Sequence, residues 1–208
     1  MNKRFIAMPD FQNLKQQNLR CLDALTYVSI RSFNNIDKGY AYPPYEQIME
    51  RSGMGRTFIG ESIKRLETAG LLVIEHSKRE GTCNRYHFGK LPHFERIPYE
   101  LFDANELSGH EKAMLICLRQ FFIHGPLQCG YDIKTLAIRL GVTYKQVYGP
   151  LKGLIAKGYI GERNIYHKSS GKSSTRLFYT SKMDWDYDFG LIKAAPIPIV
   201  KEFSLKVA

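Results

Sequence analysis

The chain has few of the residues that build metal or disulfide frameworks. Its four cysteines, at positions 21, 83, 117 and 129, include no Cys-x-x-Cys pair, and its six histidines show no metal-ligand spacing. Structural zinc sites and small disulfide-bonded domains both depend on closely paired ligands. We therefore expect no metal, no cofactor and no disulfide framework.

Long apolar runs are also absent. The first four residues, Met-Asn-Lys-Arg, carry two positive charges, but no sustained apolar segment follows them. A secretory signal needs an apolar stretch after such charges, and a membrane-spanning helix needs about 20 apolar residues. The sequence therefore predicts no signal peptide, no membrane span and a cytoplasmic location.

Acidic residues are scarce relative to basic ones. The chain holds 20 aspartates and glutamates against 30 lysines and arginines, which gives a net charge of +10 and a pI near 9.4. This balance favours a polyanionic partner, and nucleic acid is the commonest one. The 208 residues are enough for one or two domains, each with a core of its own.

The stretch from Tyr42 to Leu72 carries the strongest pattern. Its first helix is expected just after Pro43-Pro44, because proline suits the opening turn of a helix and cannot continue one from upstream. Gly53-Met54-Gly55 supplies the backbone freedom of a sharp turn. This order predicts a helix-turn-helix.

A second helix is expected from about Arg56 to Ala69. Ile59, Ile63 and Leu66 recur at helical spacing and form one apolar stripe, and Gly70 is placed to end the helix in the left-handed conformation. A strand should leave from Leu71.

This stretch resembles the winged-helix DNA-binding module of GntR-type and MarR-type regulators and of plasmid Rep-type replication initiators. Such modules usually have a capping serine or threonine where this chain has Gly55. The resemblance implies binding of double-stranded DNA through the second helix of the motif. The matching residues are Tyr42, Pro43, Ile48, Gly53, Arg56, Ile59, Ile63, Leu66, Gly70, Leu71 and Leu72.

The flanking residues complete a first winged-helix domain over 13–90. Apolar residues recur at helical spacing from Leu14 to Phe33, a short strand is expected at Tyr40–Tyr42, and two strands flank a charged hairpin tip at 78–82. Residues 1 to about 12 are expected to be disordered, as chain ends often are.

The second half repeats the first with a single offset of 88 residues. Gly53 and Gly141 differ by 88, as do Gly70 and Gly158, and the apolar positions between them stay in register. Repeated units with matched apolar positions indicate a duplicated architecture. The predicted fold is therefore α+β and mainly helical, with two tandem winged helix-turn-helix domains, the second at 99–180. A tail at 181–208 should dock on the protein.

Local signals support this second copy, with one conflict. Ser108, Asp132 and Thr143 stand where helix N-caps belong, and Glu111 follows Ser108 at capping-box spacing. Gly149-Pro150, however, lies inside the expected recognition helix, where proline removes a hydrogen bond at a cost of about 3 kcal/mol. We therefore expect a kinked or shortened helix there.

The candidate DNA-binding residues lie on the two recognition helices and the two wings. Early outward positions of a recognition helix read base edges, arginine to guanine being the commonest specific contact, whereas wing cations meet phosphate. Arg56 is the leading candidate, and Phe58 is a boundary residue that faces either a thymine methyl or the core. The set is Arg56, Thr57, Phe58, Glu61, Lys64, Arg65, Lys78, Arg79, Arg85, Thr143, Tyr144, Lys145, Gln146, Tyr148, Lys168, Lys172 and Arg176.

Two catalytic patterns fail. Ser170-Gly171-Lys172-Ser173 imitates the end of a P-loop, but Tyr166 stands where the first glycine belongs. His110-Glu111 has no second histidine four residues on. The sequence therefore predicts a binding protein and not an enzyme.

Three functions fit these expectations. The first is a replication initiator of a plasmid, phage or other mobile element, since paired winged helices in one chain resemble Rep-type initiators. The second is a transcriptional regulator whose second winged helix mediates dimerisation. The third is a protein-binding scaffold. Homodimerisation and contact with the replication or transcription machinery are further partner hypotheses, whereas no membrane contact is expected.

Overall fold

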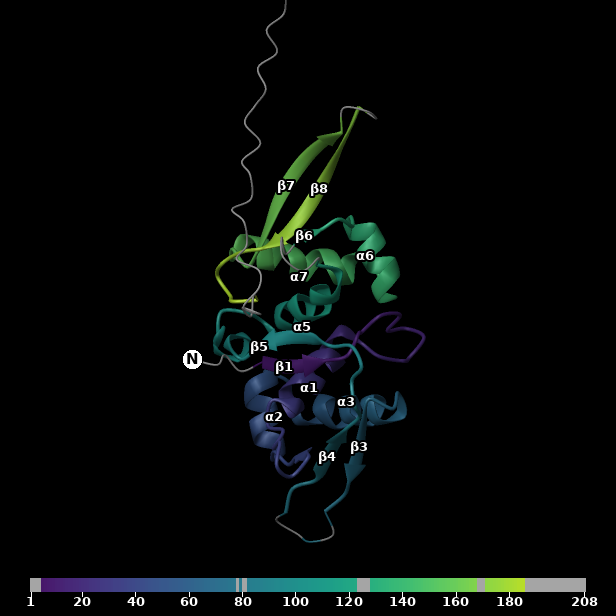
Figure 1. Ribbon diagram of the computed structural model, residues 1–208, viewed down its shortest axis with the longest axis vertical. Coiled ribbons are helices and arrows are strands. Elements are labelled where there is room, and N and C mark those ends of the chain that lie inside the picture. The colour runs from purple at the N-terminus through teal and green to yellow at the C-terminus, as the bar shows by residue number, and fades with distance from the viewer. Residues whose placement is uncertain (1–4, 78, 80–81, 123–127, 168–170, 186–208) are drawn as a thin grey trace, which may run out of the picture.

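The computed structural model describes residues 5–77, 79, 82–122, 128–167 and 171–185. We call residues 13–90 the N-terminal half and residues 99–180 the C-terminal half. In Figure 1 the strand hairpins of the two halves lie at opposite ends of the long axis. The two halves meet through helices in the middle of the molecule.

The N-terminal half has the predicted order of elements. The turn at 53–55 lies between two helices, and Gly53 and Gly70 adopt the left-handed conformation with φ of 69° and 70°. Its sheet has the order β2-β4-β3, and both pairings are antiparallel. The elements are α1 (Cys21–Arg31), β2 (Tyr40–Ala41), α2 (Tyr45–Ser52), α3 (Arg56–Thr68), β3 (Leu72–Glu75) and β4 (Arg85–Phe88).

The C-terminal half shows the same order. α2 and α6 begin 88 residues apart, at Tyr45 and Ile133, and α3 and α7 do so at Arg56 and Tyr144. Its sheet order, β6-β8-β7, matches β2-β4-β3. The elements are α5 (Gly109–Leu118), η1 (Arg119–Phe121), β6 (Gln128–Cys129), α6 (Ile133–Leu140), α7 (Tyr144–Ala156), β7 (Ile160–His167) and β8 (Lys172–Tyr179).

Several local predictions are confirmed. Ser108, Asp132 and Thr143 each accept a backbone hydrogen bond as an N-cap. Of the two outcomes expected for the helix that contains Pro150, a kink or a shortening, the shortening is not observed, because α7 spans 13 residues, as many as α3. Val147, Leu151 and Leu154 are buried on both sides of the proline and hold the helix against the core.

Two predictions about the N-terminal lead-in are wrong. Residues 5–8 are not disordered: β1 (Phe5–Met8) pairs antiparallel with β5 (Glu95–Pro98), which lies between the two predicted domains at 13–90 and 99–180. The first helix begins at Cys21, because Leu14 and Leu19 are buried in a turn that precedes it. A short helix, α4 (Glu100–Asp103), follows β5.

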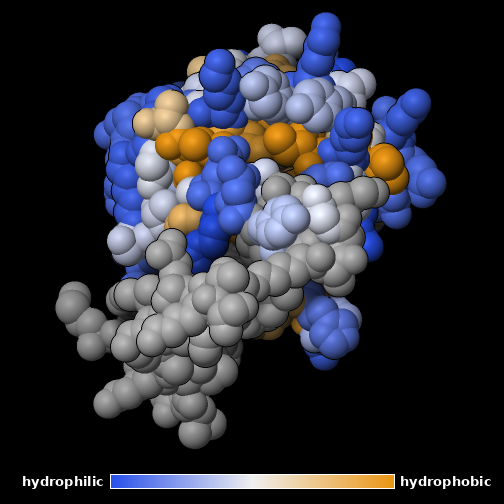
Figure 2. Space-filling view, turned by 90° about the horizontal axis from the view of Figure 1, so that it is seen from above, coloured by the Kyte–Doolittle hydropathy of each residue, from blue (hydrophilic) through white to orange (hydrophobic). Residues whose placement is uncertain are grey.

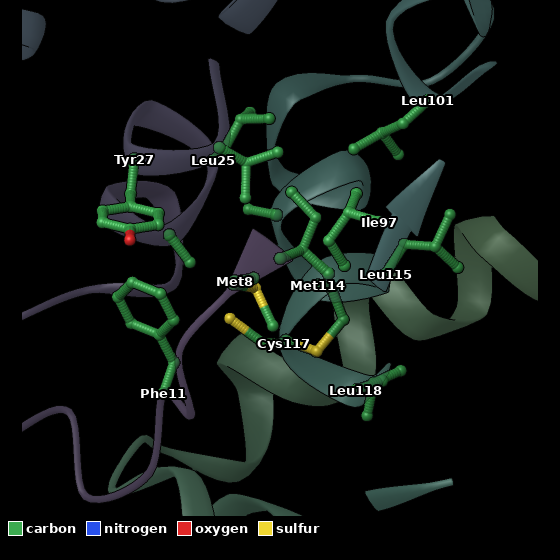
Figure 3. Packing of buried hydrophobic residues seen from close by; sticks show 14 of the residues in the cluster. Met8, Phe11, Leu25, Tyr27, Ile97, Leu101, Met114, Leu115, Cys117 and Leu118 are labelled. Atoms are coloured by element: carbon green, nitrogen blue, oxygen red, sulfur yellow. The ribbon is translucent and has the colours of Figure 1, made fainter. Parts of the chain in front are cut away.

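The two halves share one hydrophobic core. α1 packs against α5 with the start of one beside the end of the other, since the Cys117 Sγ lies 3.9 Å from the carbonyl oxygen of Cys21. Figure 3 shows side chains from β1, α1, β5 and α5 gathered here, including Met8, Leu25 and Met114. The halves therefore do not behave as beads on a flexible linker.

The turn between α2 and α3 and the turn between α6 and α7 each pack against the opposite half. Arg139 and Leu140 accept hydrogen bonds from the backbone N–H groups of Asn13 and Leu14 at 3.0 and 2.9 Å. Gly141, with φ of 69°, approaches the same segment so closely that a Cβ would lie 3.2 Å from the nitrogen of Lys15. On the other side the side chain of Met54 fills the space beside Gly109 that a Cβ would occupy.

The start of the C-terminal tail docks as expected. Met183 and Trp185 are buried, and the Trp185 ring stacks on Tyr179 at a centroid distance of 4.4 Å. Residues 186–208 lie outside the described part of the chain. No helix among the described residues is long and apolar enough to cross a membrane.

Candidate nucleic-acid interface

The outer face of α3 carries most of the candidate base-reading residues. Arg56, Thr57, Glu61 and Lys64 are exposed, while Ile59, Ile63 and Leu66 are buried on the opposite face. This division follows from the helical spacing of the apolar residues. The structure therefore presents four of the six residues predicted on this helix to solvent along one side.

Arg56 is held by α2 rather than projecting freely. Its Nη1 donates to Glu46 Oε1 at 2.7 Å, and its guanidinium lies 5.0 Å from the centre of the Tyr45 ring. A backbone hydrogen bond and this contact lower the pKa of Glu46. Both side chains of the pair are more than half exposed, so the pair is weak and can exchange for a phosphate or a guanine edge.

Arg65 and Phe58 do not join this outer face. Arg65 donates from Nε and Nη2 to the two oxygens of Asp23, at 3.0 and 2.8 Å, and Asp23 is fully buried on α1. This contact raises the pKa of Arg65. Phe58 is half-buried beneath the same guanidinium, 5.4 Å from it. The placement of Arg65 corrects the expectation of a DNA-facing position, because Arg65 fastens α3 to α1. Phe58 lies at the boundary between the core and the surface, as expected.

The first wing presents fewer free charges than its sequence implied. Arg79 is exposed, whereas Arg85 donates to Glu75 Oε1 at 2.9 Å. Lys78, also predicted here, lies outside the described residues. Arg79 is therefore the clearer phosphate-contacting candidate of the two that the structure describes.

Sequence reasoning missed an aromatic and cationic cluster on the outer face of the first sheet. Tyr40 lies opposite His87 in the strand register, with ring centroids 5.4 Å apart, and Tyr42 packs against Tyr40 at 5.8 Å. Arg85 and Lys38 lie over the rings of Tyr40 and Tyr42. The alternation of residues along β4 was the available signal, but it required the strand pairing to be known.

The outer face of α7 has a different character. Tyr144 and Tyr148 are each 44% exposed and stack on one another at 5.5 Å, and Lys145 is exposed beside them. Gln146, predicted as a base reader, accepts from the Thr143 backbone N–H at 2.8 Å, and Thr143 accepts from the Gln146 N–H. The two side chains therefore form the capping box of α7, which confirms Thr143 as its N-cap, and the side-chain oxygen of Gln146 is used within the protein.

The second hairpin places two arginines opposite one another. Arg163 lies directly opposite Arg176 in the register of β7 and β8, and Lys172 is the first residue of β8. Like charges placed opposite one another destabilise a sheet in isolation, so an anion beside them is favourable. Arg163 was missed because its partner becomes visible only with the register, and Lys168 lies outside the described residues.

The C-terminal half also fastens α7 to its first helix, α5. Lys157, at the end of α7, donates from Nζ to Glu111 Oε2 on α5 at 2.7 Å. Burial raises the pKa of Glu111, but hydrogen bonds from Lys157 and Ser108 outweigh it and leave the pKa below its usual value. α7 is thereby held against α5.

The described residues contain no group of three or more histidine, cysteine, aspartate or glutamate side chains that could hold a metal ion. The end of the P-loop-like sequence also lacks P-loop geometry, because Lys172 begins a strand and not a helix.

Comparison with known proteins identifies part of this region. A family of helix-turn-helix domains matches residues 17–72, which span α1, β2, α2, α3 and the first residue of β3. No curated protein matches the chain. The N-terminal half therefore contains a helix-turn-helix domain, and its exposed α3 face is the side with which such a domain contacts DNA.

Proposed function

With a helix-turn-helix domain at residues 17–72 as the premise, we propose that this protein is a sequence-specific binder of double-stranded DNA built from two tandem winged helices. The observation that carries the proposal is the exposed face of α3, where Arg56, Thr57 and Lys64 stand at the positions from which a recognition helix reaches base edges. The net charge of +10 supports a phosphate-dominated interface.

The winged-helix assignment of both halves is supported by their matched elements. Strand, helix, turn, helix and hairpin follow one another in both, with recognition-type helices of equal length. We infer that the N-terminal half reads sequence. The C-terminal half adds phosphate contacts through Lys145, Arg163 and Arg176, while its capping box engages the side-chain oxygen that Gln146 would otherwise offer to a base. We propose no catalytic activity.

Within this class, the proposed role is replication initiation on a plasmid, phage or other mobile element. Two recognition helices in one rigid chain support it, because such a chain engages DNA without a second copy. A transcriptional regulator that uses its C-terminal half to dimerise is the alternative, and the exposed Tyr144–Tyr148 stack is the observation that favours it, since exposed aromatic residues are enriched at protein interfaces.

Mapping the sites that the protein occupies across a genome tests this proposal. Clustered direct repeats beside an origin are expected for an initiator, and an inverted repeat at a promoter for a regulator. Arg56→Ala serves as the matched control and should lose the enrichment at specific sites. A protein-binding scaffold would give no enriched sites with either the wild-type protein or the Arg56→Ala variant. That result would contradict the DNA-binding proposal.

A further inference from the structure

A cleft of about 1100 Å³ lies where the two halves meet. One wall is formed by residues 15–22, before and within the start of α1, another by the start of α5, and the third by the turn and first residues of α7. The lining therefore comes from three segments that are far apart in the sequence and that the shared core holds together.

The cleft has an apolar floor. Leu19, Ala113 and Met114 are buried there, and Leu22, Val142 and Pro150 complete the lining. Small-molecule sites in proteins are concave, mostly apolar and frequent between domains, with a few polar groups that orient the ligand. A floor of this kind suits an organic body, such as a ring or a short chain, better than a bare phosphate.

Its polar edge is cationic. Lys15, Arg20 and Lys145 are exposed at the cleft together with His110, and among the described residues none of the four forms an ion pair. One carboxylate, Glu111, also lines the cleft, but Lys157 neutralises it at 2.7 Å. The edge therefore offers an anion several charges that the protein itself leaves available.

We propose that this cleft is a binding site for a small organic anion, with its apolar body on the floor and its carboxylate, sulfonate or phosphate group between Lys145 and Arg20. Two other occupancies of this cleft, by a DNA backbone or by a dye that binds unspecifically, would make different contacts. A DNA backbone passing the cleft would engage the cationic edge without filling the floor, and an unspecific dye-binding surface would not depend on these side chains.

A ligand bound in the cleft would affect α7, which belongs to the proposed DNA-contacting surface. The wall at 141–143 is the turn that begins α7, and it is already tied to the segment before α1 by the hydrogen bonds from Asn13 and Leu14. A ligand that bridges Arg20 and Lys145 adds a second tie between the same elements and changes the cost of moving α7. This regulatory consequence, unlike ligand binding itself, rests on the proposed function.

The test uses anilinonaphthalene sulfonate, an amphiphilic aromatic anion, and follows its fluorescence with the full chain in the absence of DNA. His110→Trp places a large side chain on the edge of the cleft and should weaken binding about tenfold or more, whereas His76→Trp, on an exposed residue outside it, should not. Lys145→Ala should weaken binding about fivefold, in the range of a partly exposed ion pair. Lys152→Ala, on the same helix but outside the lining, is its control.

Cysteine alkylation gives an independent measurement. Cys21 lines the cleft, and a hydrogen bond with the Cys117 thiol lowers its pKa, while Cys83 is exposed on the first hairpin. The dye should slow iodoacetamide labelling of Cys21 at least threefold, which is roughly the effect of two-thirds occupancy, and leave the labelling of Cys83 unchanged. Equal dye affinity of His110→Trp and His76→Trp would overturn the proposal. So would protection of Cys21 by a DNA duplex but not by the dye, which would assign the cleft to the DNA interface.

Discussion

The two halves place the same helices at the same relative positions but treat the helix starts differently. In the N-terminal half the three residues before α1, α2 and α3 are Arg20, Pro44 and Gly55, and none of them provides a side-chain cap. The residues 88 positions later are Ser108, Asp132 and Thr143, and all three cap their helices. The C-terminal half thus caps its helices from within. In the N-terminal half Asp23 accepts from the Arg20 backbone N–H at 2.8 Å at the start of α1, whereas α2 and α3 begin without a side-chain cap and leave N–H groups open to external acceptors such as phosphate.

Both halves contain an ion pair between two of their helices, but different residues form it. Each joins the helix after its turn, α3 or α7, to a carboxylate at the third position of its first helix: Asp23 is bound by Arg65, and Glu111 by Lys157. The residue that corresponds to Arg65 is Gly153, and a Cβ there would collide with the Glu111 carboxylate. The contact between helices is retained while the cation moves to the end of α7.

Removing Arg65 should therefore destabilise the N-terminal half more than removing Lys157 destabilises the C-terminal half. Arg65→Ala leaves the fully buried Asp23 without its partner, and we expect a loss of about 3 to 5 kcal/mol in the free energy of unfolding. Lys157→Ala should cost less, because its side chain is 35% exposed and water reaches the site. Urea denaturation measures both. The double variant Asp23→Leu/Arg65→Leu is the control, and it should recover much of the loss.

Truncation at matched core positions tests whether the halves unfold together. Ile63 and Leu151 lie 88 residues apart on α3 and α7 and are 2% and 1% exposed. Each change to alanine should cost about 2 to 5 kcal/mol through lost burial and a cavity. Because α1 and α5 belong to one core, we expect a single transition for both variants by circular dichroism and tryptophan fluorescence. Two separate transitions would show that the halves are independent.

The sequence was most informative where the signal is local. Pro44, Gly53 and Gly70 punctuate the helices at the positions where they begin and end, so α2 and α3 were located to within a residue. The register of 88 residues carried the same boundaries into the C-terminal half. Thr143-x-x-Gln146 is a capping-box pattern, so the role of Gln146 was also available from sequence.

Contacts between distant segments could not be predicted in this way. β1 is a strand because it pairs with β5, about 90 residues later in the chain. A segment of four residues carries too weak a hydrophobic pattern to predict such a pairing. Arg65 faces α1 because Asp23 is buried opposite it, 42 residues earlier in the chain. The sequence alone does not tell whether a charged residue at the edge of the apolar stripe of a helix faces solvent or a neighbouring helix. The position of the neighbouring helix decides this.

The proposed difference in base reading between the two halves can be tested at the first residues of α3 and α7. Arg56→Ala should weaken binding to a specific site by about 1 to 3 kcal/mol and relax the preference at one base position. Tyr144→Ala, 88 residues later, should have a smaller effect that is equal for all duplexes. Fluorescence anisotropy with specific and random duplexes at two salt concentrations measures both. Equal losses on both kinds of DNA from the two variants would contradict the idea that only α3 reads sequence.

The smallest expected effects concern the helix starts themselves. Thr143→Ala removes the cap of α7 and should lower stability by about 1 kcal/mol, whereas Gly55→Ser should add only a few tenths, because glycine is itself tolerated at this position. DNA binding should respond differently: the new hydroxyl at position 55 accepts from the N–H groups that we expect to face phosphate, so affinity should fall while stability rises. Urea denaturation and anisotropy on the same Gly55→Ser preparation measure the two effects together. If affinity and stability rise together, the open start of α3 is not a phosphate contact, and the difference in capping between the halves has no bearing on DNA binding.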